Sequence, residues 1–94
     1  MIVYNVTFSV DKEIADEWIV WMKDVHIPLV LKAGLFESVK ILKVLSHEDE
    51  QTDSFAVQFY SRSAESVEKY HLNDDVQQRF GERVLSYPTL LKEV

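Results

Sequence analysis

The sequence contains no cysteine, only two glycines and two prolines, and no long uninterrupted run of apolar residues. Without cysteine there can be no disulfide framework and no thiol chemistry. Two glycines are too few for the glycine-rich loops that hold nucleotide phosphates. Because charged residues interrupt the apolar stretches, we expect no membrane span. The first residues follow a strand pattern instead of that of a signal peptide, which predicts a cytoplasmic protein.

Basic residues are also in the minority, with ten Lys and Arg against 16 Asp and Glu and a net charge of −6. An acidic surface repels phosphate backbones, so nucleic acid is not an expected partner. Glu48, Asp49, Glu50 and Asp53 lack the spacing and the glycine of a calcium-binding EF-hand loop. G-x-S-x-G and H-E-x-x-H motifs are absent. We therefore expect neither a metal site nor a cofactor.

The length of 94 residues fits one compact domain, residues 1–94. Apolar residues alternate with polar ones in several segments, whereas others follow the helical period of 3.6. These patterns predict, in order, strand 2–10, a helix from Asp11, strand 36–46, strand 54–61, a helix from Ser63 to Gly81, and strand 83–94. The order is β-α-β-β-α-β, which predicts an α+β fold of the ferredoxin-like type with both helices on one face of the sheet.

The first helix is expected to begin at Asp11 as N-cap and to bury one apolar stripe. The stripe consists of Ile14, Trp18, Trp21, Met22 and Val25. Pro28 removes a backbone donor and disfavours helix at the residue before it, so we expect the helix to end or kink there. Gly34 is a natural left-handed helix end. In the last strand, Pro88 is tolerated mainly at a sheet edge.

Both faces of the middle strands carry apolar side chains, which suggests that both faces contact protein. With helices on one face, the open face would carry residues such as Leu42, Val44, Ala56 and Tyr60. An apolar sheet face requires a partner, and the simplest partner is a second copy of the chain. We therefore predict a homodimer.

His26 is the best candidate for a functional side chain, because imidazole can act as acid, base or hydrogen-bond donor near neutral pH. If the helix is regular, His26 shares a face with Trp18 and Met22. The alternative is that His26 caps the end of the helix before Pro28 by donating to free carbonyls. His47, beside the acidic loop, is expected to be solvated, and His71 to lie on a half-exposed helix.

Aromatic residues near His26 could line an apolar pocket with a few polar groups. The predicted ligand-binding residues are Tyr4, Asn5, Trp18, Trp21, Met22 and His26, and the predicted catalytic residue is His26. The alternative is that these aromatic residues are core.

Three segments, Met1–Thr7, Trp18–Pro28 and Gly34–Lys40, resemble a family of small bacterial proteins, the domain of unknown function 4286. More distantly, Trp21–Leu29 and the Gly34-Leu35 pair are similar to the helix-one pattern of EthD-like members of the dimeric α/β-barrel superfamily. That resemblance implies a homodimer whose two sheets form a barrel, with a ligand cleft between sheet and helices. Relatives include cofactor-free monooxygenases, haem enzymes and isomerases of small lactones.

The haem-degrading relatives are similar in having an asparagine on the first strand, here Asn5, and a histidine on the second helix, here His71. They also use a tryptophan beyond the hairpin. This sequence has no tryptophan after Trp21 and departs from the haem pattern there.

The function predicted from the sequence is binding of a small apolar or aromatic molecule between sheet and helices. One alternative is a cofactor-independent monooxygenase or isomerase, with His26 as acid or base and Asn5 or Tyr4 orienting the substrate. Another is a structural or interaction dimer without a pocket.

Overall fold

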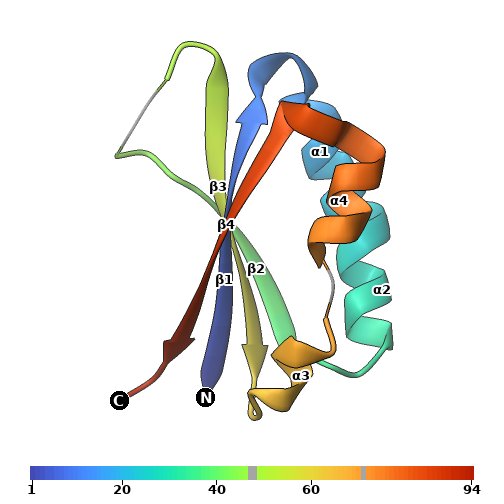
Figure 1. Ribbon diagram of the computed structural model, residues 1–94, viewed down its shortest axis with the longest axis vertical. Helices are drawn as coiled ribbons and strands as arrows, with labels where there is room; N and C mark the ends of the chain where they lie inside the picture. Colours follow the sequence, from blue (N-terminus) through green and yellow to red (C-terminus); the bar gives the residue numbers. More distant parts are fainter. Residues whose placement is uncertain (47–48, 71) are drawn as a thin grey trace.

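The computed structural model describes residues 1–46, 49–70 and 72–94, with the backbone alone for 72–74. The strands are β1 (Ile2–Asp11), β2 (Ser38–Lys43), β3 (Thr52–Ser61) and β4 (Val84–Lys92). The helical segments are η1 (Lys12–Ile14), α1 (Ala15–Trp21), η2 (Met22–His26), α2 (Ile27–Lys32), α3 (Glu65–Glu68), α4 (Leu72–Phe80) and η3 (Gly81–Arg83). The predicted βαββαβ order is confirmed (Figure 1).

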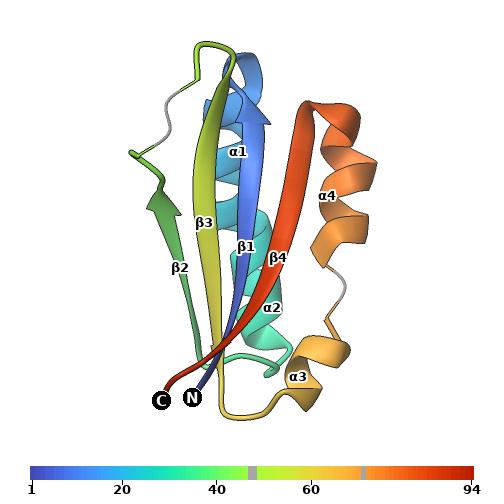
Figure 2. The ribbon, with the colours of Figure 1, turned by 60° about the vertical axis from the view of Figure 1, so that its left-hand side comes forward.

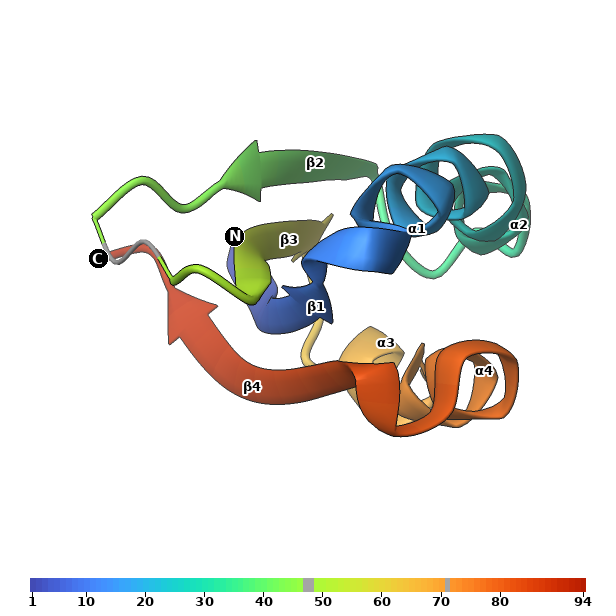
Figure 3. The ribbon, with the colours of Figure 1, turned by 90° about the horizontal axis from the view of Figure 1, so that it is seen from above.

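The four strands form one antiparallel sheet in the order β2-β3-β1-β4 (Figure 2). Seen from above, the helices lie on one side of this sheet and leave the other side open (Figure 3). This is the ferredoxin-like arrangement predicted from the sequence. Within the described parts of the chain, no helix has both the length and the apolar character to cross a membrane.

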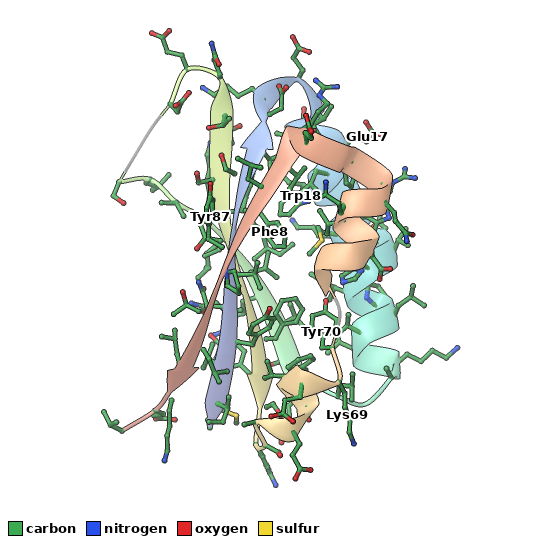
Figure 4. All side chains as sticks on the ribbon, in the orientation of Figure 1. Phe8, Glu17, Trp18, Lys69, Tyr70 and Tyr87 are labelled. Carbon is green, nitrogen blue, oxygen red and sulfur yellow. The ribbon has the colours of Figure 1, made fainter. Side chains whose placement is uncertain are left out.

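The core lies between the central strands and the helices, as the alternation of β1 and β3 predicts. Its strand residues are Val6, Phe8 and Val10 on β1 and Phe55, Val57 and Phe59 on β3, all buried. Trp18 of α1 is fully buried between two of them, with its ring centroid 5.2 Å from Phe8 and 5.1 Å from Phe55. Figure 4 shows Trp18 and Phe8 turned toward each other in this layer.

The sequence predicts that the first helix ends or kinks at Pro28; it does not end there but continues to Lys32, with an irregular turn just before the proline. The chain instead forms a π-helical turn, η2, in which the Ile27 N–H donates to the carbonyl of Met22. Pro28 lacks the N–H of a regular turn, and its ring would clash with the carbonyl four residues earlier. A π-turn is one of the ways a helix accommodates such a break.

The π-turn also changes which residues face the sheet. Apart from Ala15, the buried positions follow a spacing of four: Ile14, Trp18, Met22, His26 and Val30. The prediction that Val25 belongs to this stripe is wrong, since its side chain is 45% exposed. A π-turn contains more residues than the 3.6 of an α-helical turn, so residues four apart stay on the same side of the helix, and His26 faces the sheet. The helix ends at Gly34, whose φ of 77° confirms the predicted left-handed end.

The other predicted strands and helices differ from the observed ones by one or two residues at their ends, except in two places. β2 covers only Ser38–Lys43 instead of residues 36–46, and Val44 therefore lies beyond the strand. The predicted helix from Ser63 to Gly81 is two helices, α3 and α4, with Tyr70 between them. The Oγ of Ser63 accepts a hydrogen bond from the Glu65 N–H, and Gly81 ends α4 with a φ of 60°, both as expected.

The open face of the sheet carries apolar side chains mainly along β4. This strand lies at the edge of the sheet, as expected from Pro88. Leu85, Tyr87 and Leu91 are 53%, 57% and 43% exposed. Tyr87 projects away from the helices (Figure 4). Cross-strand pairing places Leu42 opposite Ala56 on the same face. The predicted apolar character of this face is thus observed, with β4 contributing most of it.

Replacing Trp18 with alanine is expected to lower the free energy of unfolding by about 3–5 kcal/mol, because a large aromatic leaves a cavity in a closed core. Chemical denaturation of both proteins measures this. Val20→Ala, on the exposed side of the same helix, serves as control and should cost less than about 0.5 kcal/mol. A loss below about 1 kcal/mol for Trp18→Ala would contradict the closed core.

Candidate functional site

The π-turn η2 positions His26 against the ring of Trp21, five residues earlier. The two rings are stacked, with centroids 5.0 Å apart and an angle of 26° between their planes. The five-residue hydrogen bonding of a π-turn brings these two positions to one side of the helix. Trp21 also contacts the edge of Phe80 from α4. His26 is thereby held in one orientation and is only 3% exposed.

Both ring nitrogens of His26 face side chains from the second helical region. Nε2 lies 2.5 Å from the hydroxyl of Tyr70, and Nδ1 lies 3.8 Å from a carboxylate oxygen of Asp75. The alternative that His26 caps a helix end at Pro28 is therefore wrong, because the helix continues to Lys32 and the ring nitrogens of His26 face side chains instead of helix carbonyls. The three side chains form a line, Tyr70–His26–Asp75, from the buried layer to the surface.

Burial lowers the pKa of His26, and the Asp75 carboxylate only partly opposes this effect. Neutral imidazole carries one N–H and one acceptor nitrogen. The carboxylate of Asp75 favours the proton on Nδ1, so Nε2 accepts the hydrogen bond that the Tyr70 hydroxyl donates. Burial also raises the pKa of Tyr70, and Asp75 and Tyr4 raise it further. Tyr70 thus stays protonated and remains the donor.

Aromatic rings surround Tyr70 between the sheet and the helices (Figure 4). Its ring centroid lies 5.0 Å from Phe59, 5.2 Å from Phe36 and 6.4 Å from Tyr4. Tyr4 is half-buried, and burial raises its pKa as well. Two neutral phenols and an imidazole therefore lie among apolar rings. Such a set can orient a small apolar molecule by hydrogen bonds, and the Tyr70–His26 pair can also pass a proton.

The predicted site residues separate into three groups. Tyr4, Trp21 and His26 lie in or beside the Tyr70 cluster. Trp18 and Met22 are fully buried in the core, and the indole N–H of Trp18 has no hydrogen-bond partner among the described residues. Asn5 lies on the opposite, open face of the sheet.

On that open face, the Asn5 amide donates to the Thr7 hydroxyl at 3.3 Å. Strand alternation separates Asn5 from Tyr4, so it cannot share a site with His26. His47 and His71 lie outside the described residues.

The sequence reasoning missed Tyr70 and Asp75 as partners of His26. Tyr70 follows α3 directly, and its only local signal was an aromatic residue on the apolar side of a predicted helix. Its separation of 44 residues from His26 makes the contact tertiary, and Asp75 was one acid among many.

A hollow of about 510 Å³ opens beside His26 on the outer side of the helices. It is lined by Trp21, Val25, His26, Leu29, Asp75, Gln78 and Arg79. The line of side chains thus has one end at this surface and the other at the Tyr4–Tyr70 pair. Across the described residues, no group of three or more His, Asp or Glu could hold a metal ion.

The family model of a domain of unknown function, DUF4286, matches residues 1–94. The chain belongs to this family. The family description names no activity. No curated protein is significantly similar to the chain in sequence.

Solved structures of similar shape include an ethyl tert-butyl ether D (EthD) family protein from Bacillus halodurans, with 14% identity and a TM-score of 0.67 over the whole of both chains. A dimeric ferredoxin-like protein from an uncultured marine organism has 9% identity and a TM-score of 0.62, covering 99% of this chain and 97% of the other. The de novo designed protein Foldit4 has 11% identity and a TM-score of 0.66, covering 99% and 98%. At these identities the likeness establishes the fold alone.

The buried state of His26 predicts a pH dependence of stability. Its folded pKa lies below the unfolded value of about 6.5, so the unfolded chain binds more protons between the two values. Stability from the neutral imidazole is therefore complete above about pH 6.5 and declines as the pH falls below it. Thermal unfolding across this range should show a smaller decline for His26→Gln, which keeps a polar group near Tyr70 but does not titrate. Equal declines would contradict burial of a neutral His26.

Proposed function

We propose that the chain forms a homodimer through the open faces of its sheets and binds a small apolar or aromatic molecule between sheet and helices. The Tyr70–His26–Asp75 line among aromatic rings is the observation that carries this proposal. Buried polar groups in an apolar surrounding are how small-molecule sites achieve orientation and specificity. Cytoplasmic residence and the absence of nucleic-acid binding remain predictions from the sequence.

The exposure of one end of β4 supports a route by which a ligand could reach the space between the sheet and the helices. Leu90 pairs with Tyr4 across the strands, and equal alternation puts both on the helix-facing side. Leu90 is nevertheless 55% exposed, since the helices do not cover this end of β4. Tyr4 and Tyr70 are only half-buried beneath it. We infer that a ligand enters here and contacts the two phenols.

The Tyr70–His26 pair favours an isomerase as the second candidate. In such a reaction Tyr70 takes a proton from one substrate atom while passing its own proton to Nε2 of neutral His26, and Asp75 stabilises the imidazolium formed. The imidazolium then returns this proton to Tyr70, which protonates a second substrate atom, so both side chains are restored. Among the sequence-based alternatives, this takes precedence over a monooxygenase because two proton-carrying groups are in direct contact. Asn5 has no role in it, because it lies on the other face of the sheet.

Native mass spectrometry of protein purified from its source cells tests the binding proposal. The wild-type chain should retain a small molecule, and Tyr70→Phe and His26→Gln should lose it while remaining folded. Tyr87→Phe removes the same hydroxyl from the open face and should retain the molecule. Equal retention by Tyr70→Phe and the wild type would refute the assignment of the site. A wild-type dimer that carries nothing would support the structural-dimer alternative.

The dimer proposal rests on Leu85, Tyr87 and Leu91 along an exposed edge strand, a surface that proteins usually cover. One of the structural neighbours is described as a dimeric ferredoxin-like protein, which supports the proposal. Leu85→Lys places a charge on this face and should shift sedimentation from dimer to monomer. Leu29→Lys, at an equally exposed leucine of α2 (61% against 53%), should not. A wild-type monomer at all concentrations would overturn the proposal.

A further inference from the structure

A second hollow, of about 470 Å³, lies on the outer side of the helical layer between the first helix and α4. It is lined by Asp16, Glu17, Val20, Trp21, Asp24, Val25 and Arg79. It adjoins the hollow beside His26, with which it shares Trp21, Val25 and Arg79. It lies away from both the open sheet face and the Tyr4–Tyr70 pair. The function proposed above therefore does not use it.

Apolar side chains form much of this hollow and are unusually exposed. Val20 is 57% exposed and Val25 45%, on either side of the half-buried Trp21. Val20 lies on the outer side of α1, before the π-turn, and the π-turn turns His26 inward and leaves Val25 at the surface. The volume falls within the range of about 300–1,000 Å³ found for small-molecule sites.

The charges around this apolar patch are mostly negative. Three carboxylates, Asp16, Glu17 and Asp24, face one guanidinium, Arg79. Arg79 lies 3.8 Å from Glu17 and over the ring of Phe80. In the described part of the chain, Asp16 and Asp24 make no ion pair and are exposed. A ligand with a positive charge and an apolar body would therefore match both properties of the surface.

We propose that this hollow binds a small organic cation, an amine with an apolar or aromatic body. The body packs on Trp21, Val20 and Val25, and the ammonium group lies near Asp24. The indole face attracts cations and the carboxylate complements the charge. A neutral analogue of the same shape keeps only the apolar contacts, and an anionic one is repelled.

Two-dimensional NMR of the folded wild-type chain tests this with 2-phenylethylamine as the probe and 2-phenylethanol as its neutral match. The amine should shift the indole N–H of Trp21 and the amides of Val20 and Val25 in a saturable way, and it should bind more tightly than the alcohol. Asp24→Asn should weaken amine binding about two- to fivefold, as expected for one exposed ion pair, and leave the alcohol unchanged. Val20→Thr should weaken both.

Glu68→Gln is the control, because it removes one negative charge from an exposed position on α3. It should leave amine binding unchanged. An equal loss in this control would show that the overall acidic charge attracts the amine, and it would overturn the proposal. Absence of saturable shifts at Trp21, or equal binding of amine and alcohol, would also overturn it. The Tyr70 cluster is tested by the variants described above.

Discussion

The helical layer depends on how the chain accommodates Pro28 within a continuous helix. A regular turn would require an N–H that proline lacks, and its ring would collide with the preceding turn. The π-turn Met22–His26 lies just before this proline and shifts the phase of the helix. His26 is thereby turned inward and stacked on Trp21, while Val25 is turned outward. The buried imidazole and the exposed side chain of Val25 are two consequences of one backbone feature.

The inward histidine then connects the two helical regions. Tyr70 lies between α3 and α4 and contacts the strands through Phe59 and the first helix through His26. Leaving a buried imidazole nitrogen without a partner costs about 1–3 kcal/mol, so this hydrogen bond stabilises the position of Tyr70. Asp75 extends the line to the surface. A polar path across an otherwise aromatic layer is more than packing requires, which is why it supports a binding or proton-transfer role.

The fold could be predicted from the sequence because its signals are local. The alternation in residues 2–10 and 54–61 gave β1 and β3, and Asp11, Ser63, Gly34 and Gly81 marked helix ends through their own backbone chemistry. The site could be predicted only in part. His26, Trp21 and Tyr4 were identified by residue type, whereas the partners of His26 depend on tertiary packing that no spacing encodes. The assumption of a regular helix gave the wrong orientation for Val25. The alternation of side chains along β1 places Asn5 on the open face of the sheet and so excludes it from the site of His26.

The protonation state of His26 is the most informative measurement, because the Tyr70–His26–Asp75 line depends on a neutral imidazole with its proton on Nδ1. Long-range ¹H–¹⁵N NMR of the imidazole nitrogens, followed as a function of pH, measures both the tautomer and the pKa. We expect a neutral ring at pH 7, a protonated Nδ1, an acceptor Nε2 and a pKa below about 6.5. A proton on Nε2 of the neutral ring, or a pKa above that value, would contradict this expectation.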